Sequence, residues 1–281
     1  MRLLSPRQLA SALGVSESSL KRWVDSGKIA AARTEGGHRK ITLAEAVRFI
    51  RETGAPLAHP ELLDMPEVAI AYERALSGDG RLTTHLVAGD TIAARGWLLS
   101  RYLAGASIEE LGDGPIKEAM HALGELWNHE EGGIFIEHRG TDICLQALAQ
   151  LRNTFEPSTT APVALGGAPE RDPYLLPTFL AATVVASAGM RAVNLGPDTP
   201  IGALQAAITH YAPKLVWISA SSPVPAQQAR EIAAWIASMP AGPTVLVGGR
   251  ESECIAREGT HIRTCDSMSS LADIARSFAT T

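Results

Sequence analysis

The sequence is poor in cysteine, and the placement of its cysteines argues against two classes of protein. Cys144, Cys254 and Cys265 are the three in 281 residues, and no two of them have CxxC spacing. A disulfide-stapled secreted domain and a zinc site built on cysteine pairs are therefore not expected. This cysteine usage is typical of the reducing cytoplasm, which is the localisation we expect.

Long apolar runs are also missing. No stretch of apolar residues reaches the length that spans a bilayer, and the first residues lack the pattern of a signal peptide. The sequence therefore predicts no membrane partner.

Charge is distributed unevenly along the chain. The whole sequence carries a formal charge of −5, whereas residues 1–54 hold ten Lys or Arg and five Asp or Glu, a net +5. The remainder therefore carries −10. A basic end on an acidic body indicates one module that contacts nucleic acid and a larger part that does not.

Two short helices are predicted at the start of this basic segment. Ser5 can cap a helix over residues 6–13, which Gly14 ends, and Ser16 can cap a second helix that runs to about Asp25. Such a helix pair is typical of a helix-turn-helix module.

A basic hairpin follows the second helix. Residues 29–41 have the pattern of two strands joined at Gly36-Gly37, and a helix is predicted from 42 to about 52. Together these elements predict a winged helix-turn-helix, whose second helix enters the major groove of DNA. The run Gly36-Gly37-His38-Arg39 before a helix resembles the MerR family of transcription regulators, and the resemblance covers residues 1 to about 54.

We expect this module to bind double-stranded operator DNA through its second helix and its wing. Helix residues would face the groove, and wing residues would contact phosphates. One module makes few contacts, so we expect a homo-oligomer, a dimer or a tetramer, on repeated half-sites. The expected contacts are Ser18, Ser19, Lys21 and Arg22 in the helix and Arg33, His38, Arg39 and Lys40 in the wing.

The rest of the chain divides into a helical and an α/β part. Residues 54–60 predict a linker, and residues 156–162 predict a second boundary. Between them the apolar pattern is helical over 61–155, with four helices expected at about 61–77, 83–104, 108–128 and 134–154.

Residues 162–281 alternate short β-rich runs with helices. Alternating βα units predict a doubly wound parallel sheet, so the expected fold class is α/β with an all-α part: a winged helix-turn-helix, a four-helix bundle and a Rossmann-like sheet. The strands are expected at 163–167, 192–196, 215–219, 244–248 and 261–265.

Ligands bind such sheets at the carboxyl ends of the strands. No GxGxxG follows the first strand, so the dinucleotide fingerprint is missing. Glycine pairs at Gly166-Gly167 and Gly248-Gly249 would let a large ligand approach the backbone closely. Glycines in these loops also occur for purely structural reasons.

The helical part contains a sharper motif, in which Trp127-Asn128 precedes Glu137-His138 across a helix–helix corner. Taken alone, these residues could be ordinary core and a solvated helix start. Their place between the winged module and the α/β part resembles the CarH-type (CarH/LitR) cobalamin-dependent photoreceptor repressors, over nearly the whole chain. The fold expected of the α/β part is then of the cobalamin-binding type.

That resemblance implies a function for each part. The helical bundle would cap the upper face of adenosylcobalamin, with Trp127 on the adenosyl group and Glu137 and His138 beside it. The α/β domain would hold the lower face. Light would break the cobalt–carbon bond and dissociate a DNA-bound tetramer. The pocket for the nucleotide tail would be lined by Ser219, Ser221, Gly248 and Gly249.

Two departures from the family fall on the cobalt ligands. The lower axial histidine of the family belongs to a Glu/Asp-x-His-x-x-Gly loop, which here begins with Asp172 and has Tyr174 at the ligand position. The upper ligand of the light state is replaced by Asn128. A phenol with a pKa near 10 and an amide are both poor ligands compared with a neutral imidazole. We therefore assign no residue as a metal ligand, with Tyr174 at the axial position, and we expect light switching to be impaired.

Three alternatives follow for the cofactor. The protein could bind cobalamin without a protein ligand on cobalt, keep the scaffold without a cofactor, or hold heme, for which Tyr174 could serve as a ligand. The helical and α/β parts also resemble corrinoid-carrying modules of methyltransferases. No nucleophile–base arrangement is visible, however, and those modules use the missing histidine. We therefore expect a ligand-responsive transcription regulator, a repressor, and not an enzyme.

Overall fold

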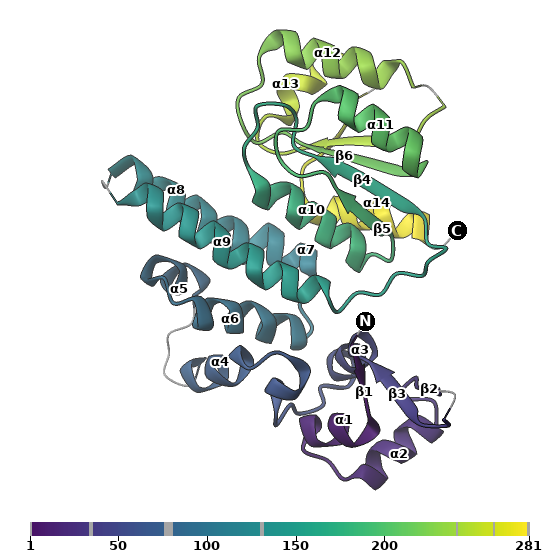
Figure 1. Cartoon of the computed structure of the whole chain (residues 1–281). Helices are drawn as coiled ribbons and strands as arrows, with labels where there is room; N and C mark the ends of the chain where they lie inside the picture. The colour runs from purple at the N-terminus through teal and green to yellow at the C-terminus, as the bar shows by residue number, and fades with distance from the viewer. Residues whose placement is uncertain are drawn as a thin grey trace. The chain divides into compact units, whose positions relative to one another are not determined.

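The computed structural model describes residues 2–33, 36–75, 81–129, 132–239, 241–260 and 262–279, with the backbone alone for 72–75 and 127–129. The chain forms two compact units, Met1–Ser107 with Gly114–Thr154, and Ile108–Asp113 with Phe155–Thr281 (Figure 1). We call the former the first unit and the latter the sheet unit. The division into three domains at 1–54, 61–155 and 162–281 remains a prediction.

The first unit begins with the predicted winged helix-turn-helix. Ser5 and Ser16 accept hydrogen bonds as the N-caps of α1 and α2, and Thr42 does so for α3. An unpredicted strand, β1, completes an antiparallel sheet in the order β1-β3-β2. The elements are β1 (Leu3–Leu4), α1 (Pro6–Leu13), α2 (Glu17–Asp25), β2 (Ala32–Arg33), β3 (Arg39–Thr42) and α3 (Leu43–Thr53).

The helical part of the first unit is more broken than the sequence pattern predicts. Its elements are η1 (Pro60–Leu63), α4 (Glu67–Ala75), α5 (Leu82–Ala88), α6 (Thr91–Leu103), α8 (Lys117–His129) and α9 (Gly133–Arg152). The expectation of single helices over 61–77, 83–104 and 108–128 is therefore wrong, whereas 134–154 corresponds to α9.

Local chemistry explains each break. Gly89 has a left-handed φ of 72° and ends α5, after which Asp90 accepts the Ala93 N–H at 3.0 Å and starts α6. Asp64 ends η1 in the same left-handed conformation. Pro115 lies in a π-helical turn between α7 and α8, because proline cannot donate the hydrogen bond of an uninterrupted α-helix.

The sheet unit confirms the predicted doubly wound α/β fold. Its five parallel strands have the order β5-β4-β6-β7-β8 (Figure 1). The strands are β4 (Val163–Gly167), β5 (Arg191–Asn194), β6 (Leu215–Ser219), β7 (Thr244–Gly248) and β8 (Arg263–Cys265). The helices are α7 (Ile108–Leu111), α10 (Leu175–Ser187), α11 (Ile201–Tyr211), α12 (Ala226–Ala237), α13 (Ser252–Ala256) and α14 (Met268–Ala279).

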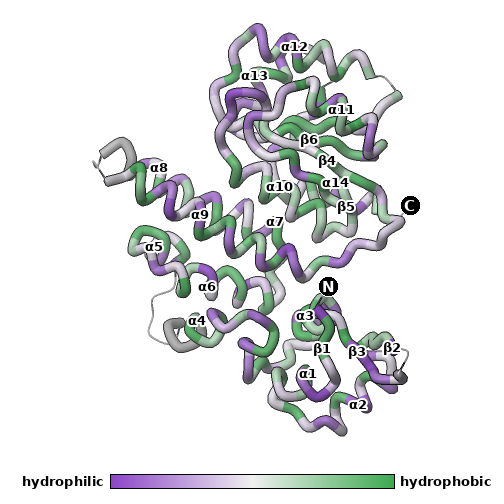
Figure 2. The backbone as a smooth tube through the Cα atoms, viewed as in Figure 1, coloured by the Kyte–Doolittle hydropathy of each residue, from purple (hydrophilic) through white to green (hydrophobic). Residues whose placement is uncertain are grey.

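The central strands are buried between two helical layers. Figure 2 shows β4 and β6 as largely hydrophobic, as expected of parallel strands covered on both faces. Helices α10 and α14 pack together with α7, whereas α12 packs on α13. Among the described residues, no helix is both long and apolar enough to cross a membrane.

The short helix α7 belongs to the sheet unit because polar contacts anchor it to α14. The Asp113 carboxylate accepts the backbone N–H groups of Met268 and Ser269, at 2.7 and 2.9 Å, and so caps α14. Arg276 forms an ion pair with the buried Glu109. These contacts join residues far apart in the sequence, which a local pattern does not reveal.

Candidate functional site

The second helix of the winged module presents polar groups on one side and an apolar anchor on the other. Leu20 is fully buried, whereas Lys21 and Arg22 are exposed. The capping Ser16 hydroxyl lies 2.9 Å from that of Ser18 and 3.0 Å from that of Ser19. The start of α2 therefore carries hydroxyl and cationic groups, the types that contact base edges and phosphates.

The wing places two arginines directly opposite each other. Arg33 of β2 pairs in register with Arg39 of β3, and Lys40 pairs with Ala32. Opposing residues of a ladder share one face, and like charges there are destabilising unless an anion lies against them. His38 and Arg33 are exposed. The wing thus concentrates positive charge in the manner of a phosphate-binding surface.

Arg39 also connects the wing to the second helix. Its guanidinium forms an ion pair with Asp25, the last residue of α2. The pair fixes the end of α2 against β3, so Arg39 both carries charge and sets the position of the helix.

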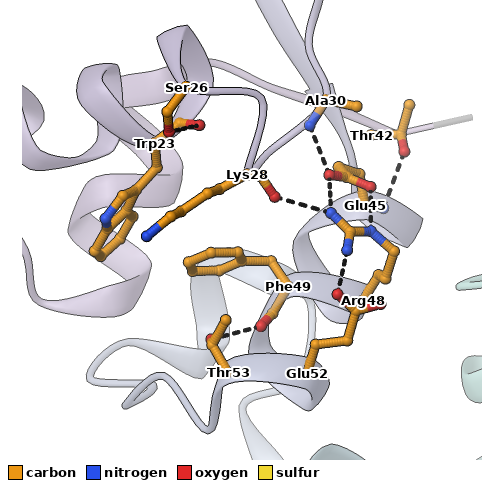
Figure 3. Close-up of polar contacts among 10 residues, drawn as sticks. All are labelled: Trp23, Ser26, Lys28, Ala30, Thr42, Glu45, Arg48, Phe49, Glu52 and Thr53. Atoms are coloured by element: carbon orange, nitrogen blue, oxygen red, sulfur yellow. Dashed lines mark hydrogen bonds and ion pairs between the residues drawn. The ribbon is translucent and has the colours of Figure 1, made fainter.

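A polar brace behind the wing, half-buried at Glu45 and exposed at Arg48, was missed by the sequence analysis (Figure 3). Glu45 of α3 accepts the Ala30 N–H at 2.6 Å and two hydrogen bonds from Arg48, at 2.7 and 2.5 Å. Arg48 also donates to the Lys28 carbonyl at 3.0 Å. Burial alone would raise the pKa of Glu45, but the hydrogen bonds from Arg48 and Ala30 and the charge of Arg48 hold it below its ordinary value. The brace fixes the chain between α2 and β2.

The signal for this brace is a Glu-x-x-Arg pair after a helix N-cap. Thr42 caps α3 by accepting the Glu45 N–H at 3.1 Å, and Arg48 lies one turn later. Phe49 packs on Trp23 of α2, with ring centroids 5.1 Å apart (Figure 3). The third helix therefore supports both the wing and α2.

The predicted cap residues lie at the corner between α8 and α9. Trp127 and Asn128 belong to α8, but their side chains lie outside the described residues. Glu137 accepts a hydrogen bond from Thr141 at 3.1 Å, and the exposed His138 has Nε2 3.6 Å from its carboxylate. The predicted contact of these residues with an adenosyl group remains a prediction.

Exposed apolar side chains accompany this corner. Ile134 is 48% exposed and Phe135 is 59% exposed, both in the first turn of α9. Arg139 lies 5.3 Å from the centre of the Phe135 ring and donates to the Val87 carbonyl at 2.7 Å. Two adjacent apolar side chains are therefore exposed at the start of α9.

In the sheet unit, the loop after β4 is held by one buried carboxylate. Asp172 is 2% exposed and accepts the backbone N–H groups of Ser221 at 2.5 Å, Ser222 at 2.9 Å and Tyr174 at 3.1 Å. Its hydrogen-bonding capacity is used in joining the loops that follow β4 and β6. It does not orient an axial ligand in this arrangement.

Tyr174 occupies the position just before α10 and is half-buried. The Arg250 guanidinium lies 5.6 Å from the centre of its ring, a cation–π distance. No group of three or more His, Cys, Asp or Glu side chains arranged to hold a metal occurs in the described parts of the chain.

Backbone packing explains the second predicted glycine pair. Gly249 has a φ of 97°, and a Cβ at this position would collide with the backbone of Ala220. A Cβ on Gly248 would lie 3.0 Å from the Cys265 carbonyl oxygen. Ser219 and Ser221 are buried beside these loops. Backbone packing thus requires glycine at position 249 and favours it at position 248, whether or not a ligand binds.

A buried tryptophan, also missed by the sequence analysis, lies beneath this edge. Trp217 is 3% exposed, and its indole N–H donates to the Thr178 hydroxyl of α10 at 3.0 Å. The strand register places Trp217 opposite Gly166, where a Cβ would collide with the indole. No local sequence pattern signals this contact, because it depends on the register of β4 against β6.

These residues do not fit cobalamin in the mode that the family resemblance implies. That mode needs an imidazole on cobalt and space inside the sheet unit for the nucleotide tail. Here a phenol stands at the ligand position, Asp172 is used elsewhere, and the indole of Trp217 lies behind Ser219.

A cavity of about 240 Å³ lies on the other face of the sheet. It is lined mainly by α11, α12 and the end of β6, and includes Ile201, Leu204, Gln228, Ile232 and Trp235. Since Trp217 and Ser219 face α10, this cavity is distinct from the predicted tail pocket.

Two family models match the chain, one in the predicted DNA-binding part and one in the helical part. Residues 3–54 match the family model of a helix-turn-helix domain, and residues 80–152 match that of a B12 binding domain. No curated protein matches the chain.

Three solved structures are similar to this chain at low sequence identity. The Methanosarcina barkeri monomethylamine corrinoid protein has 16% identity and a TM-score of 0.56, over 70% of this chain and 95% of that one. A cobalamin-binding protein from Desulfitobacterium hafniense DCB-2 has 15% identity and a TM-score of 0.38, covering 70% and 96%. The methanol:cobalamin methyltransferase complex of Methanosarcina barkeri has 14% identity and a TM-score of 0.41, over 95% of this chain and 93% of that one.

The first of these structures shows the fold alone. The chain thus combines a helix-turn-helix domain with helices and a Rossmann-like sheet of the cobalamin-binding type. The MerR and CarH-type assignments are finer than these findings and remain predictions.

Proposed function

We propose that this protein is a transcription regulator, a MerR-type repressor, that binds operator DNA through residues 2–54 and senses a corrinoid through its helical and sheet parts. One observation carries the proposal. The exposed Lys21 and Arg22 of α2 and the opposed Arg33 and Arg39 of the wing lie on one braced module. This arrangement supports groove and phosphate contacts, and of the four residues Arg39 also positions α2 through its ion pair with Asp25.

The corrinoid part of the proposal rests on the matched B12 binding helices and on the apolar corner at Ile134 and Phe135. The chain offers no imidazole at Tyr174, so the protein would hold the corrinoid by burial of its ring. Light switching through axial histidines is not part of this proposal.

A second candidate is a regulator that keeps the scaffold and has lost the cofactor, with heme as a further ligand to test. The observation that favours it is the internal use of Asp172 and the buried position of Trp217. An absorption spectrum of the purified protein, before and after incubation with adenosylcobalamin and desalting, separates these cases. Retained corrin bands support corrinoid sensing, and a Soret band indicates heme. If both kinds of band are absent, the protein keeps the scaffold without a cofactor.

We propose regulation and not catalysis as the activity. Asp172 and Tyr174, which stand in the loop where the resembled family has its cobalt ligand, contact other residues of the protein and have no histidine beside them in the sequence. Oligomerisation through a second copy would supply the further half-site contacts that one small module lacks.

The test begins with the full-length protein and a library of genomic DNA fragments. Fragments retained through repeated selection are labelled, and affinity is measured by fluorescence anisotropy across a salt series. Saturable binding that weakens linearly in log salt supports the proposal. Failure to enrich any fragment over a tag-only control would contradict it.

A further inference from the structure

The sheet unit uses its interior space beneath α10 for one large side chain. The Trp217 indole N–H donates to Thr178, whose hydroxyl donates to the Asn194 Oδ1 at 2.9 Å. The same oxygen accepts the Gly196 N–H at 3.2 Å. Thr178 is fully buried. The indole is thus held at its polar end by a chain of hydrogen bonds across β6, α10 and β5.

The apolar part of the indole is matched by a glycine. Gly166 of β4 pairs with Trp217 in the parallel register, and any Cβ there would collide with the indole and with the Trp217 carbonyl. The absence of a side chain at Gly166 of β4 therefore leaves the space that the indole fills.

Strand geometry relates this indole to the predicted tail pocket. Alternate residues of a strand face the same side, so Trp217 and Ser219 both face α10. Val216, Ile218 and Ala220 face the other side, where they form a core with Ile232. Ser219 is the last residue of β6. A group that entered from the carboxyl edge past Ser219 would meet the indole of Trp217.

We propose that Trp217 closes the interior of the sheet unit, so that a bound corrinoid keeps its nucleotide base outside the protein core and on its own cobalt. This inference rests on the proposed corrinoid sensing and adds how the ligand is held. It agrees with an independent observation, because Tyr174 supplies no imidazole to displace that base.

The first experiment compares cobalamin with cobinamide, which lacks the nucleotide tail. Binding to full-length protein is measured by equilibrium dialysis. A buried tail would make cobalamin the tighter ligand by at least about tenfold. We expect the two affinities to differ by less than about threefold, since the tail contacts solvent. A preference for cobalamin above about tenfold in the wild type would overturn the inference.

A spectroscopic readout tests the cobalt ligand. Bound cob(II)alamin should show the triplet splitting of one axial nitrogen by electron paramagnetic resonance. The splitting should be the same in protein labelled with ¹⁵N, because the nitrogen belongs to the ligand. A change to a doublet in labelled protein would show a protein nitrogen on cobalt and contradict the inference.

A third experiment does not depend on corrinoid binding. Trp217→Ala should create a cavity that binds free 5,6-dimethylbenzimidazole, so that the base raises the Tm of this variant and not of the wild type. Trp23→Ala, which removes an indole from α2 in the other unit, serves as the control and should show no such rise. Trp217→Leu replaces Trp217→Ala if the smaller residue prevents folding.

The outcomes separate the two claims. If the wild type retains neither cobalamin nor cobinamide, the corrinoid part of the proposed function fails, and the base-binding experiment still decides the role of Trp217. If the base stabilises wild type and Trp217→Ala equally, or stabilises neither, the closure inference is wrong.

Discussion

The winged module and the carboxyl edge of the sheet use their polar groups in opposite ways. In the module, Lys21, Arg22 and Arg33 are exposed, and the polar brace of Glu45 and Arg48 lies behind them. At the sheet edge, the Asp172 carboxylate is already used by the protein, because it accepts backbone N–H groups from the loops after β4 and β6. The contrast suggests that the module is arranged for a partner, whereas the sheet edge has become largely structural.

The largest effect should come from the second helix. Lys21→Ala with Arg22→Ala removes two exposed contacts, and because each is worth about 1–3 kcal/mol, affinity for selected DNA should fall by about a thousandfold. Fluorescence anisotropy measures the loss. Arg230→Ala, an exposed charge on α12, is the control and should bind as the wild type does. Equal loss in both variants would show non-specific charge attraction in place of a defined interface.

The next effect tests the structural reading of the sheet edge. Asp172→Ala leaves the buried N–H groups of Ser221 and Ser222 without an acceptor, so the free energy of unfolding should fall by about 3 kcal/mol. Urea unfolding of the full chain measures it. The exposed Asp266→Ala should change stability by less than about 0.5 kcal/mol. Should the two variants unfold alike, the carboxylate does not anchor these loops.

The wing should give a smaller loss that salt can diagnose. Arg39→Ala should weaken binding to all DNA sequences by about tenfold and reduce the salt slope by about one, because one phosphate contact is lost. Asp25→Ala breaks the same ion pair and keeps the arginine, so it separates the structural role from the phosphate contact. If Asp25→Ala reproduces the full loss, or if Arg39→Ala keeps the wild-type salt slope, the wing does not contact phosphate through Arg39.

The brace behind the wing should respond to acid. The folded-state pKa of Glu45 lies below its ordinary value of 4.5, so its stabilisation is complete above that pH and is lost as pH falls through the folded pKa. At neutral pH, Glu45→Gln should cost about 1 kcal/mol of local stability. Hydrogen exchange over residues 26–33, followed by mass spectrometry, measures the difference. It should shrink below pH 4.5, and a constant difference down to the lowest pH would contradict this role.

The smallest expected effect is no effect. With Tyr174 and Asn128 in place of the histidines of the resembled family, green light should not change the oligomeric state after incubation with adenosylcobalamin in the dark. Sedimentation velocity before and after illumination measures it. A dark tetramer that dissociates in light would show that another group serves as the switch.

Local chemistry made most elements of the structure predictable. The caps at Ser5 and Ser16 and the buried β6 follow from short sequence patterns, and they appear where expected. The break at Gly89 also had a local signal, since glycine before aspartate ends one helix and caps the next. The helical spacing of apolar residues, taken alone, predicted one helix where the structure has α5 and α6.

Contacts between distant segments could not be predicted in the same way. The pairing of Gly166 with Trp217 depends on the register of β4 against β6. The use of Asp172 depends on the loop after β6. Both decide whether the sheet edge is open to a ligand. A family motif can therefore locate residues in the fold without showing which other groups of the protein they contact.

One measurement tests the central claim most directly: the affinity of the full-length protein for a selected DNA fragment, by anisotropy, with and without cobalamin. The account predicts saturable, salt-dependent binding that Lys21→Ala with Arg22→Ala weakens by about a thousandfold and that added cobalamin changes in strength. Binding that is indifferent to cobalamin would leave a regulator that has lost its cofactor. No saturable binding to any fragment would contradict the account.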